Sequence, residues 1–373
     1  MLHFEQGRPG QLAEIVNFAG HAYGSDGVPE DFPALLPKLY GPEAHSEAMH
    51  TLLWEDDRLV GIFALQVSEF WAAGVPLKVG WIGSVAVDPA ERGRGHLGRL
   101  MREANRQLER QGCALGVLGG QRQRYQVFGY EYGGSQWLFT VTGRNIRDEK
   151  RPESLRVTEL READVPAALA LYLRQPVHTL RTEKNFLAIL RSWNGRPYAI
   201  WDGDLLAGYC TLDDNGCSME LVLERAELLP GVLRELLPIA GGEIHITLGP
   251  WPGNCQRLLA RISDRTVLLE NHSYRVLDWD AVLRAALAMR RAYGFPMADG
   301  TLRAAVGGQG TAVLTKSGET LTCRWEQGPE PPLPHHQAVR LLLGADSALV
   351  SGAELAPPGW LPLPLAFPWL DGI

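Results

Sequence analysis

The sequence lacks the marks of a membrane-spanning or exported protein. Among its 373 residues no apolar stretch approaches the roughly 18 residues that suggest a transmembrane helix. The first ten residues, which include Glu5, Arg8 and Pro9, do not follow the basic-then-apolar order of a secretory signal. We therefore expect a protein that makes no membrane contact and stays in the cytoplasm.

Cysteine and clustered basic residues are scarce as well. The five cysteines, at positions 113, 210, 217, 255 and 323, form no Cys-x-x-Cys pair and no cluster with histidine. We therefore expect neither a disulfide framework nor a bound metal. The net charge of −7 and the absence of a long Lys/Arg run argue against a nucleic-acid partner and leave room for a cationic small molecule.

The length and the apolar pattern divide the chain into three segments, because 373 residues exceed one typical core. In the first segment a helical stretch at 9–23 precedes strand-like runs at 51–54, 59–67 and 79–87. This alternation predicts an α/β domain. The apolar period is lost between Arg147 and Pro152, where we place the first boundary.

The second segment contains a weaker copy of a pattern in the first. The run from Trp54 to Gly61 is matched in register by the run from Trp201 to Gly208, and both indicate a strand end, an acidic turn and a new strand. The match predicts an internal duplication, with coincidence between two common hairpins as the alternative. The second copy has no turn rich in Arg and Gly, so we do not expect it to hold the same ligand.

The third segment begins with an amphipathic helix from Asp280, followed by strand-like runs near 302–306, 311–314 and 320–325 and a helix at 337–343. The tail, 356–373, combines five prolines with Trp360, Phe367 and Trp369. Proline excludes a helix there, and the aromatic content argues against a free tail. We expect this end to pack into the protein.

One strand, turn and helix have the character of an anion site. The run 80–87 predicts a strand, and after Asp88-Pro89 the turn reads Arg92-Gly93-Arg94-Gly95-His96-Leu97-Gly98. The helix that follows places Leu97, Leu100, Met101, Ala104 and Leu108 on one face. Unpaired N–H groups, the helix dipole and two arginines would suit a diphosphate. His96 could face the phosphate, but a solvated helix start is the simpler interpretation.

The two common nucleotide-binding motifs do not fit this turn. Gly93, Gly95 and Gly98 satisfy G-x-G-x-x-G, but they do not follow the first strand, and the acids at the expected distance lie on the same helix. A Walker A loop needs Gly-Lys-Ser/Thr, which is absent.

The turn resembles the coenzyme A-binding motif of the GNAT acetyltransferase superfamily, R/Q-x-x-G-x-G/A after a strand. Arg92 and Gly95 match it, whereas Leu97 stands where Gly or Ala is usual. Leu97, together with Tyr125-Gln126-Val127-Phe128-Gly129-Tyr130, is similar to the enhanced intracellular survival (Eis-like) acetyltransferases. The resemblance implies an N-acetyltransferase with acetyl-coenzyme A as co-substrate. The acceptor would be a primary amine of a small molecule or peptide, aminoglycosides included, attacking directly in a ternary complex.

The resemblance also implies the architecture. The fold class would be α/β (α+β), with tandem GNAT-like mixed sheets flanked by helices and a C-terminal α+β domain like sterol carrier proteins. The domains would be 1–148 with the acetyl-coenzyme A site, 149–279 as a degenerate second copy, and 280–373 as the sterol-carrier-protein-like domain. Relatives that form hexamers imply a homo-oligomer.

Carried over to this chain, the resemblance gives single residues their roles. Val85 and Val87, with Ala86 between them, would offer backbone groups to the pantetheine arm and thioester, and Arg92 to Gly98 would hold the pyrophosphate. Tyr125 would be the general acid that protonates the leaving thiolate. A half-buried aromatic side chain beside Phe128 is the alternative interpretation of Tyr125.

The sequence does not identify the general base. The run 81–84 holds no carboxylate, and Glu69 is the nearest acid upstream. In the Eis-like family the chain's own terminal carboxylate enters the active site, and here it would belong to Ile373. Asp371 and a water relay are the alternatives, and a tail that packs only for stability is a further one.

Two other functions are compatible with the sequence. Another acyl chain or a hydroxyl acceptor would keep the protein within the acyltransferases. A non-enzymatic acyl-coenzyme A sensor or lipid-binding module is the alternative from a different class, because the second copy shows that the fold can persist without the motif.

Overall fold

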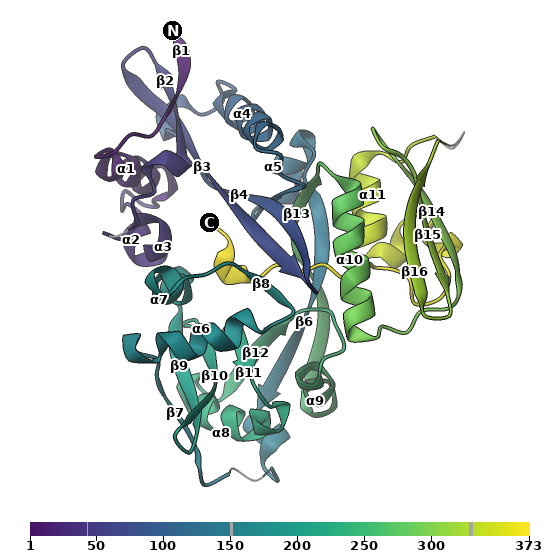
Figure 1. Cartoon of the computed structure of the whole chain (residues 1–373). Coiled ribbons are helices and arrows are strands. Elements are labelled where there is room, and N and C mark those ends of the chain that lie inside the picture. Colours follow the sequence, from purple (N-terminus) through teal and green to yellow (C-terminus); the bar gives the residue numbers. More distant parts are fainter. Residues whose placement is uncertain (43, 150–151, 328–330) are drawn as a thin grey trace.

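The computed structural model describes residues 1–42, 44–149, 152–327 and 331–373 and has a large mixed sheet at its centre (Figure 1). The strand order is β1 (Leu2–Gln6), β2 (His50–Glu55), β3 (Arg58–Ala72), β4 (Val75–Val87), β5 (Leu115–Leu118), β13 (Arg265–Val276), β6 (Glu131–Thr142), β12 (Glu243–Leu248), β11 (Cys217–Leu223), β10 (Leu205–Leu212), β9 (Arg196–Asp202) and β7 (Leu155–Glu159). A short strand, β8 (Val177–Thr179), pairs with β3. A separate sheet contains β14 (Gly300–Val306), β15 (Gly310–Ser317) and β16 (Thr320–Glu326).

Helices cover both faces of the large sheet. They are α1 (Leu12–Tyr23), α2 (Phe32–Leu35), α3 (Pro37–Tyr40), α4 (His96–Arg110), α5 (Arg122–Tyr125), α6 (Val165–Leu173), α7 (Glu183–Arg191), α8 (Leu229–Ile239), α9 (Asn254–Ile262), α10 (Trp279–Tyr293) and α11 (His335–Leu343). Leu100, Met101 and Leu108 of α4 pack on one face of β3, β4 and β5, while α1 and α10 pack on the opposite face. In the described ranges no helix is both long and apolar enough to cross a membrane.

The predicted α/β class, with a mixed sheet flanked by helices, is confirmed, and the predicted elements lie where the sequence places them. The helical stretch at 9–23 is α1, and the three strand-like runs of the first segment are the cores of β2, β3 and β4. The hairpins at 54–61 and 201–208 are β2–β3 and β9–β10. The predicted linker around Arg147 to Pro152 includes positions 150 and 151, which lie outside the described residues.

Residues 155–248 repeat the strand order of residues 2–118. In the first copy, β1 to β4 pair antiparallel in the order β1-β2-β3-β4 before β4 meets the parallel strand β5. In the second, β7, β9, β10 and β11 pair antiparallel in the same way before β11 meets the parallel strand β12. The repeated topology supports the duplication that the two hairpins predict.

The copies are joined by an exchange of strands, which the sequence does not indicate. β6, which follows the first copy, pairs with β12 of the second, and β13, which follows the second copy, pairs with β5 of the first. β6 and β13 also pair with each other, so a single sheet runs through both copies.

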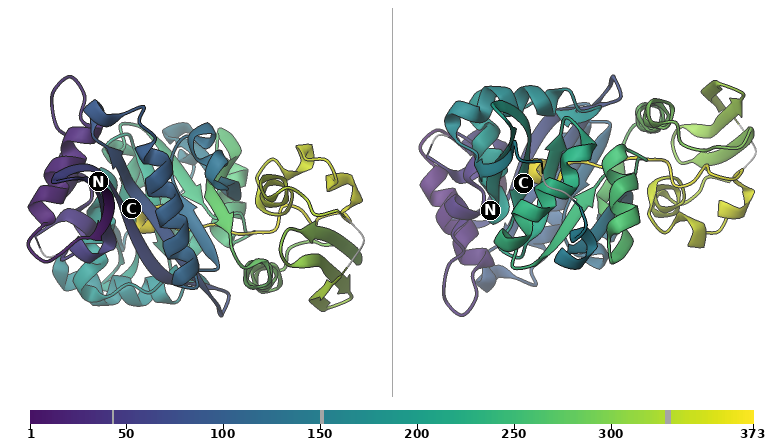
Figure 2. Two further views of the ribbon diagram at one scale, coloured as in Figure 1. Left: turned by 90° about the horizontal axis from the view of Figure 1, so that it is seen from above. Right: turned by 90° about the horizontal axis from the view of Figure 1, so that it is seen from below.

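The C-terminal tail leaves the part that contains β14 to β16 and returns to the large sheet, between the two copies (Figures 1 and 2). The backbone N–H of Ser135 donates to the carbonyl of Leu365 (3.1 Å), and the N–H of Phe367 donates to Asn271 Oδ1 (2.7 Å). Phe367, Leu370 and Ile373 are all buried. The prediction that this end packs into the protein is confirmed.

Three buried charged residues and the half-buried Lys38 hold the last residues of the tail, and we call these four the tail clamp: Lys38, Arg181, Glu220 and Asp371. Arg181 donates from Nε and Nη2 to Asp371 (3.0 and 3.2 Å) and from Nη1 and Nη2 to Glu220 (2.8 and 2.7 Å). Burial lowers the pKa of Arg181, but the negative charges of Asp371 and Glu220 outweigh burial and raise it above its ordinary value.

Lys38 completes the clamp from α3. Its Nζ donates to the carbonyls of Leu370 and Gly372, on either side of Asp371. Burial lowers the pKa of Lys38 to about 7, while the charge of Asp371 opposes that effect. The clamp therefore joins the first copy, the second copy and the tail at one point.

Replacing Arg181 with leucine should lower the free energy of unfolding by about 3–5 kcal/mol, because two buried carboxylates lose their shared cation. Urea denaturation followed by circular dichroism measures the change. The matched control is Arg174→Leu, whose guanidinium is 60 % exposed and pairs with Glu224 on the surface, so little change is expected. Equal effects of the two substitutions would show that the clamp does not stabilise the fold.

Candidate active site

The parallel pair β4–β5 opens partway along its length. The register runs from Val79–Leu115 to Ile82–Leu118, where β5 ends, whereas β4 continues to Val87. Beyond Ile82, no strand within the described residues pairs with that edge of β4. Peptide groups on such an edge can bind an extended ligand as a further strand would.

A bulge in β4 lies at the opening. Ile62 pairs with Ala86 and Ala64 pairs with Gly83, so Ser84 and Val85 together oppose a single residue of β3. Ser84 has a φ of 48°, which is uncommon for a residue with a side chain. Its hydroxyl is hydrogen-bonded to the hydroxyl of Tyr40 (2.6 Å), which lies 3.0 Å from His50 Nε2. This buried chain of side chains supports the bulge.

A cavity of about 440 Å³ fills the opening between β4 and β5. It brings together three of the residues singled out from the sequence: Val85, Tyr125 and Ile373. The walls also include Tyr23, Glu30, Phe32, Trp81, Gly83, Ser84, Gly120, Arg124, Trp193, His272 and Trp369. Ala86 and Val87 do not line the cavity. They lie further along β4, toward the turn at 92–98.

Tyr125 ends α5 and reaches the cavity after the turn at Gly119 and Gly120. Gly120 has a φ of 128°, and a Cβ on it would lie 2.8 Å from Cε2 of the Tyr125 ring, so only glycine suits this position. Burial raises the pKa of the Tyr125 hydroxyl, against a lowering effect of Arg124. The phenol is therefore protonated at neutral pH and can donate a proton.

The chain's terminus lies directly on β4. A Cβ on Gly83 would come within 1.9 Å of the backbone oxygen of Ile373, so the glycine provides the space for the last residue. Asp371 does not line the cavity, and its carboxylate accepts hydrogen bonds from Arg181. Glu69 is exposed on β3 and is not part of the cavity either.

The turn from Arg92 to Gly98 leads into α4 as predicted. Gly93 and Gly95 have φ values of 81° and 82°, and nothing lies within 4 Å of a Cβ placed on either of them. The backbone there adopts a conformation that favours glycine and faces open space, as close approach of a phosphate requires.

The arginine side chains of the turn are exposed, and each is also paired with a neighbouring group of the protein. Arg92 Nη2 donates to the carbonyl of Ala22 (2.7 Å), and Arg94 pairs with Glu91 and with Glu55 (3.2 Å). Glu91 also pairs with Arg58 (2.7 Å). The positive surface at the turn therefore combines the backbone N–H groups and the N-terminus of α4 with two exposed guanidinium groups that already have partners in the protein.

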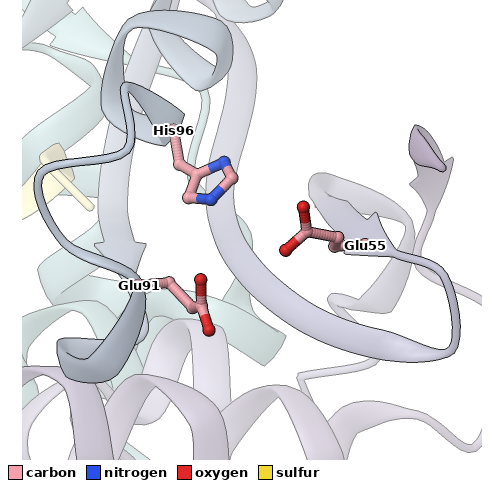
Figure 3. A group of neighbouring side chains, drawn as sticks. All are labelled: Glu55, Glu91 and His96. Carbon is pink, nitrogen blue, oxygen red and sulfur yellow. The ribbon is translucent and has the colours of Figure 1, made fainter.

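His96 lies on the inner side of the turn, facing Glu55 and Glu91 (Figure 3). It is only 3 % exposed, so the expectation of a solvated helix start is wrong. Both ring nitrogens are buried, and neither has a hydrogen-bond partner. The three side chains offer ligand atoms within 4.8 Å of one another. A metal ion there would have to displace Arg58 and Arg94 from the carboxylates, so we assign the acids to holding the turn.

Several cavity residues were not singled out from the sequence as members of a site. Glu30 adds a carboxylate from the loop before α2, and His272 adds a ring from β13. Burial lowers the pKa of His272 to about 3, so its ring is neutral. Trp369 brings a further ring from the tail. Because these residues are far apart in the chain and carry no motif, only the fold reveals them.

Replacing Gly83 with alanine should displace Ile373, since the added methyl group would occupy the position of its backbone oxygen. The displaced terminus should become open to carboxypeptidase, and mass spectrometry would show much faster release of Ile373 than in the wild type. Gly143→Ala is the matched control, because a Cβ at Gly143 meets nothing within 4 Å. Unchanged release from Gly83→Ala would contradict the placement of the terminus.

Comparison with known proteins agrees with this geometry. Residues 8–133 match the family model described as acetyltransferase (GNAT) domain. No curated protein matches the chain.

Solved structures of similar fold include the following three proteins. A GCN5-related N-acetyltransferase from Kribbella flavida has 18 % identity and a TM-score of 0.61, with 88 % of this chain and 85 % of that chain covered. A GCN5-related N-acetyltransferase from Anabaena variabilis has 15 % identity and a TM-score of 0.65, with 91 % and 89 % covered. Eis1 from Mycobacterium abscessus has 16 % identity and a TM-score of 0.61, with 98 % and 99 % covered. These likenesses show that the chain has the GNAT fold. Together with the acetyltransferase domain matched at residues 8–133, they identify an acyltransferase.

Proposed function

We propose that the protein is an N-acetyltransferase that transfers the acetyl group of acetyl-coenzyme A to a primary amine of a small molecule or peptide. The observation that carries the proposal is the cavity between β4 and β5, in which a protonated phenol, Tyr125, and the terminal residue, Ile373, meet beside the bulge at Val85. Transfer would occur by direct attack of the amine within a ternary complex.

The donor would bind along the open edge of β4. The peptide groups of Val85, Ala86 and Val87 would hydrogen-bond to the pantetheine arm, as a neighbouring strand would. The turn from Arg92 to Gly98 would hold the pyrophosphate through backbone N–H groups and the positive end of α4. The Val85 carbonyl already accepts a hydrogen bond from the Tyr23 hydroxyl (3.0 Å), so its N–H is the group offered to the ligand.

The cavity also contains the groups that the chemistry needs. A neutral amine attacks the thioester carbon, an oxyanion forms, and the carbon–sulfur bond breaks as Tyr125 gives its proton to the departing sulfur. The Ile373 carboxylate would accept the proton that the amine loses. Ile373 suits this role better than Asp371, whose carboxylate is bound by Arg181 outside the cavity. Glu30 would attract a cationic amine to the entrance.

The finer assignment is to the Eis-like acetyltransferases. The likeness to Eis1 over nearly the whole of both chains, the repeated strand order and the docked terminus all support it. We propose the division 1–148, 149–279 and 280–373, the last resembling sterol carrier proteins because it combines β14 to β16 with α10 and α11. The cytoplasmic location and the homo-oligomer stay predictions.

Thiol release from acetyl-coenzyme A, measured with the untagged protein against a panel of primary amines, tests the proposal. Amine-dependent release is expected, with the acetylated amine confirmed by mass spectrometry. Parallel reactions with propionyl- and succinyl-coenzyme A and with alcohols would reveal another acyl chain or acceptor. Saturable binding of coenzyme A without turnover on any acceptor would instead favour a sensor.

Tyr125→Phe should lower kcat about 100-fold or more, because the thiolate would leave without its proton donor. KM for acetyl-coenzyme A should change little, since the ring and its packing on Gly120 remain. Steady-state kinetics measures both constants. Tyr130→Phe is the matched control, because the Tyr130 hydroxyl bonds to Asn105 (2.9 Å) and lies outside the cavity. An equal kcat in Tyr125→Phe and wild type would remove the proposed acid.

A further inference from the structure

The second copy also contains a parallel pair that opens. β11 and β12 pair only at Cys217–His245 and Ser218–Ile246, while β11 continues to Leu223. A second cavity, of about 420 Å³, lies there. Its walls include Trp193, Met219, Leu221, Trp251, Tyr293 and Phe367. The duplicated fold therefore repeats the opening but not the turn that would bind a diphosphate.

The charge and the aromatic content of the residues that line this second cavity indicate which class of ligand it would bind. Among the described residues that line it there is no lysine or arginine to pair with an anion. Its acids are already engaged, since Glu220 is bound by Arg181 and Asp213 accepts the backbone N–H groups of Asn215 and Cys217 (both 2.8 Å). The rings of Trp251 and Tyr293 stack with centroids 5.4 Å apart. A flat or bulky apolar group matches these walls.

The two cavities share two walls. Trp193 and Trp369 line both of them, and their ring centroids are 6.1 Å apart. The tail passes from one cavity to the other, because Phe367 and Pro368 line the second while Gly372 and Ile373 line the first. One molecule that passes these two rings could occupy both cavities.

Trp193 itself has two features that favour a role in binding. Its φ of 60° is unfavourable for a large side chain, and its buried Nε1 has no hydrogen-bond partner. A ligand that passes between the cavities could supply the missing acceptor. The strained backbone of Trp193 and its unpaired indole N–H therefore both lie at the boundary between the two cavities.

We propose that the acceptor is an amine carried on an aromatic or large apolar body. The amine would enter the cavity that contains Tyr125 and Ile373, and the body would fill the second cavity beyond Trp193 and Trp369. This proposal rests on the proposed acetyltransferase function, and it specifies the class of acceptor.

The experiment compares propylamine with phenylalkylamines of increasing spacer length, from phenylethylamine to phenyloctylamine, as acceptors for the untagged full chain. One spacer length should give a kcat/KM at least about tenfold above that of propylamine, because the ring is then buried. Met219→Trp, which fills the second cavity, and Trp251→Ala, which removes a stacked wall, should each abolish most of that advantage and leave propylamine unchanged.

The matched control is Trp201→Ala, which removes a half-buried tryptophan of the same segment that lines neither cavity. It should retain the preference for the phenylalkylamine. The proposal is overturned when no phenylalkylamine exceeds propylamine, or when both cavity variants lower the two acceptors equally.

A calorimetric titration of the same phenylalkylamine separates this proposal from the function on which it rests. If no amine is acetylated but the compound binds to the wild type and not to Met219→Trp, the second cavity is a binding site and the acetyltransferase proposal fails. If amines are acetylated and the titration shows equal binding to wild type and both variants, the acetyltransferase proposal stands and the second cavity is not the acceptor site.

Discussion

The arrangement of the proposed active site depends on the buried charges of the tail clamp. Arg181 and Glu220 belong to the second copy, Lys38 belongs to the first, and Asp371 belongs to the tail. Buried charges are costly unless they are paired, so each partner needs the others in place. Because Lys38 binds the carbonyls on both sides of Asp371, the position of the terminus is set two residues before Ile373. A site built on β4 is thereby completed only when all three parts have assembled.

The two copies share the opening in a parallel strand pair, but only the first has the turn proposed to bind the acetyl donor. Both copies open a parallel pair, at β4–β5 and at β11–β12, but only the first is followed by glycines with positive φ at the start of a helix. After β11 the chain instead continues through Glu224 and Arg225 into α8. The exchange of β6 and β13 keeps the two openings in one sheet. The second opening could therefore lose the diphosphate chemistry and still contribute a wall to the first.

Local sequence patterns predicted most of the elements and part of the site. The hairpins, the strand β4, the turn at 92–98 and the packed tail follow from periodicity, glycine and proline, which act over a few residues. The strand exchange and the cavity contributions of Glu30 and His272 depend on residues far apart in the chain, and no local pattern encodes them. The solvated position expected for His96 was wrong for the same reason, since the ring is buried and lies near Glu55 of β2, a residue distant in the sequence.

The tail brings acid–base chemistry and acceptor recognition into one structural element. Phe367 and Trp369 line the second cavity, Trp369 also lines the first, and Ile373 ends beside the β4 bulge. Moving the tail would therefore change both the proposed base and the wall between the cavities. The turn that would bind acetyl-coenzyme A takes no residue from the tail, so donor binding should not depend on where the tail lies. Acceptor selection by Phe367 and Trp369 would then be coupled to proton removal by Ile373 through the tail. This coupling would not involve binding of the acetyl donor.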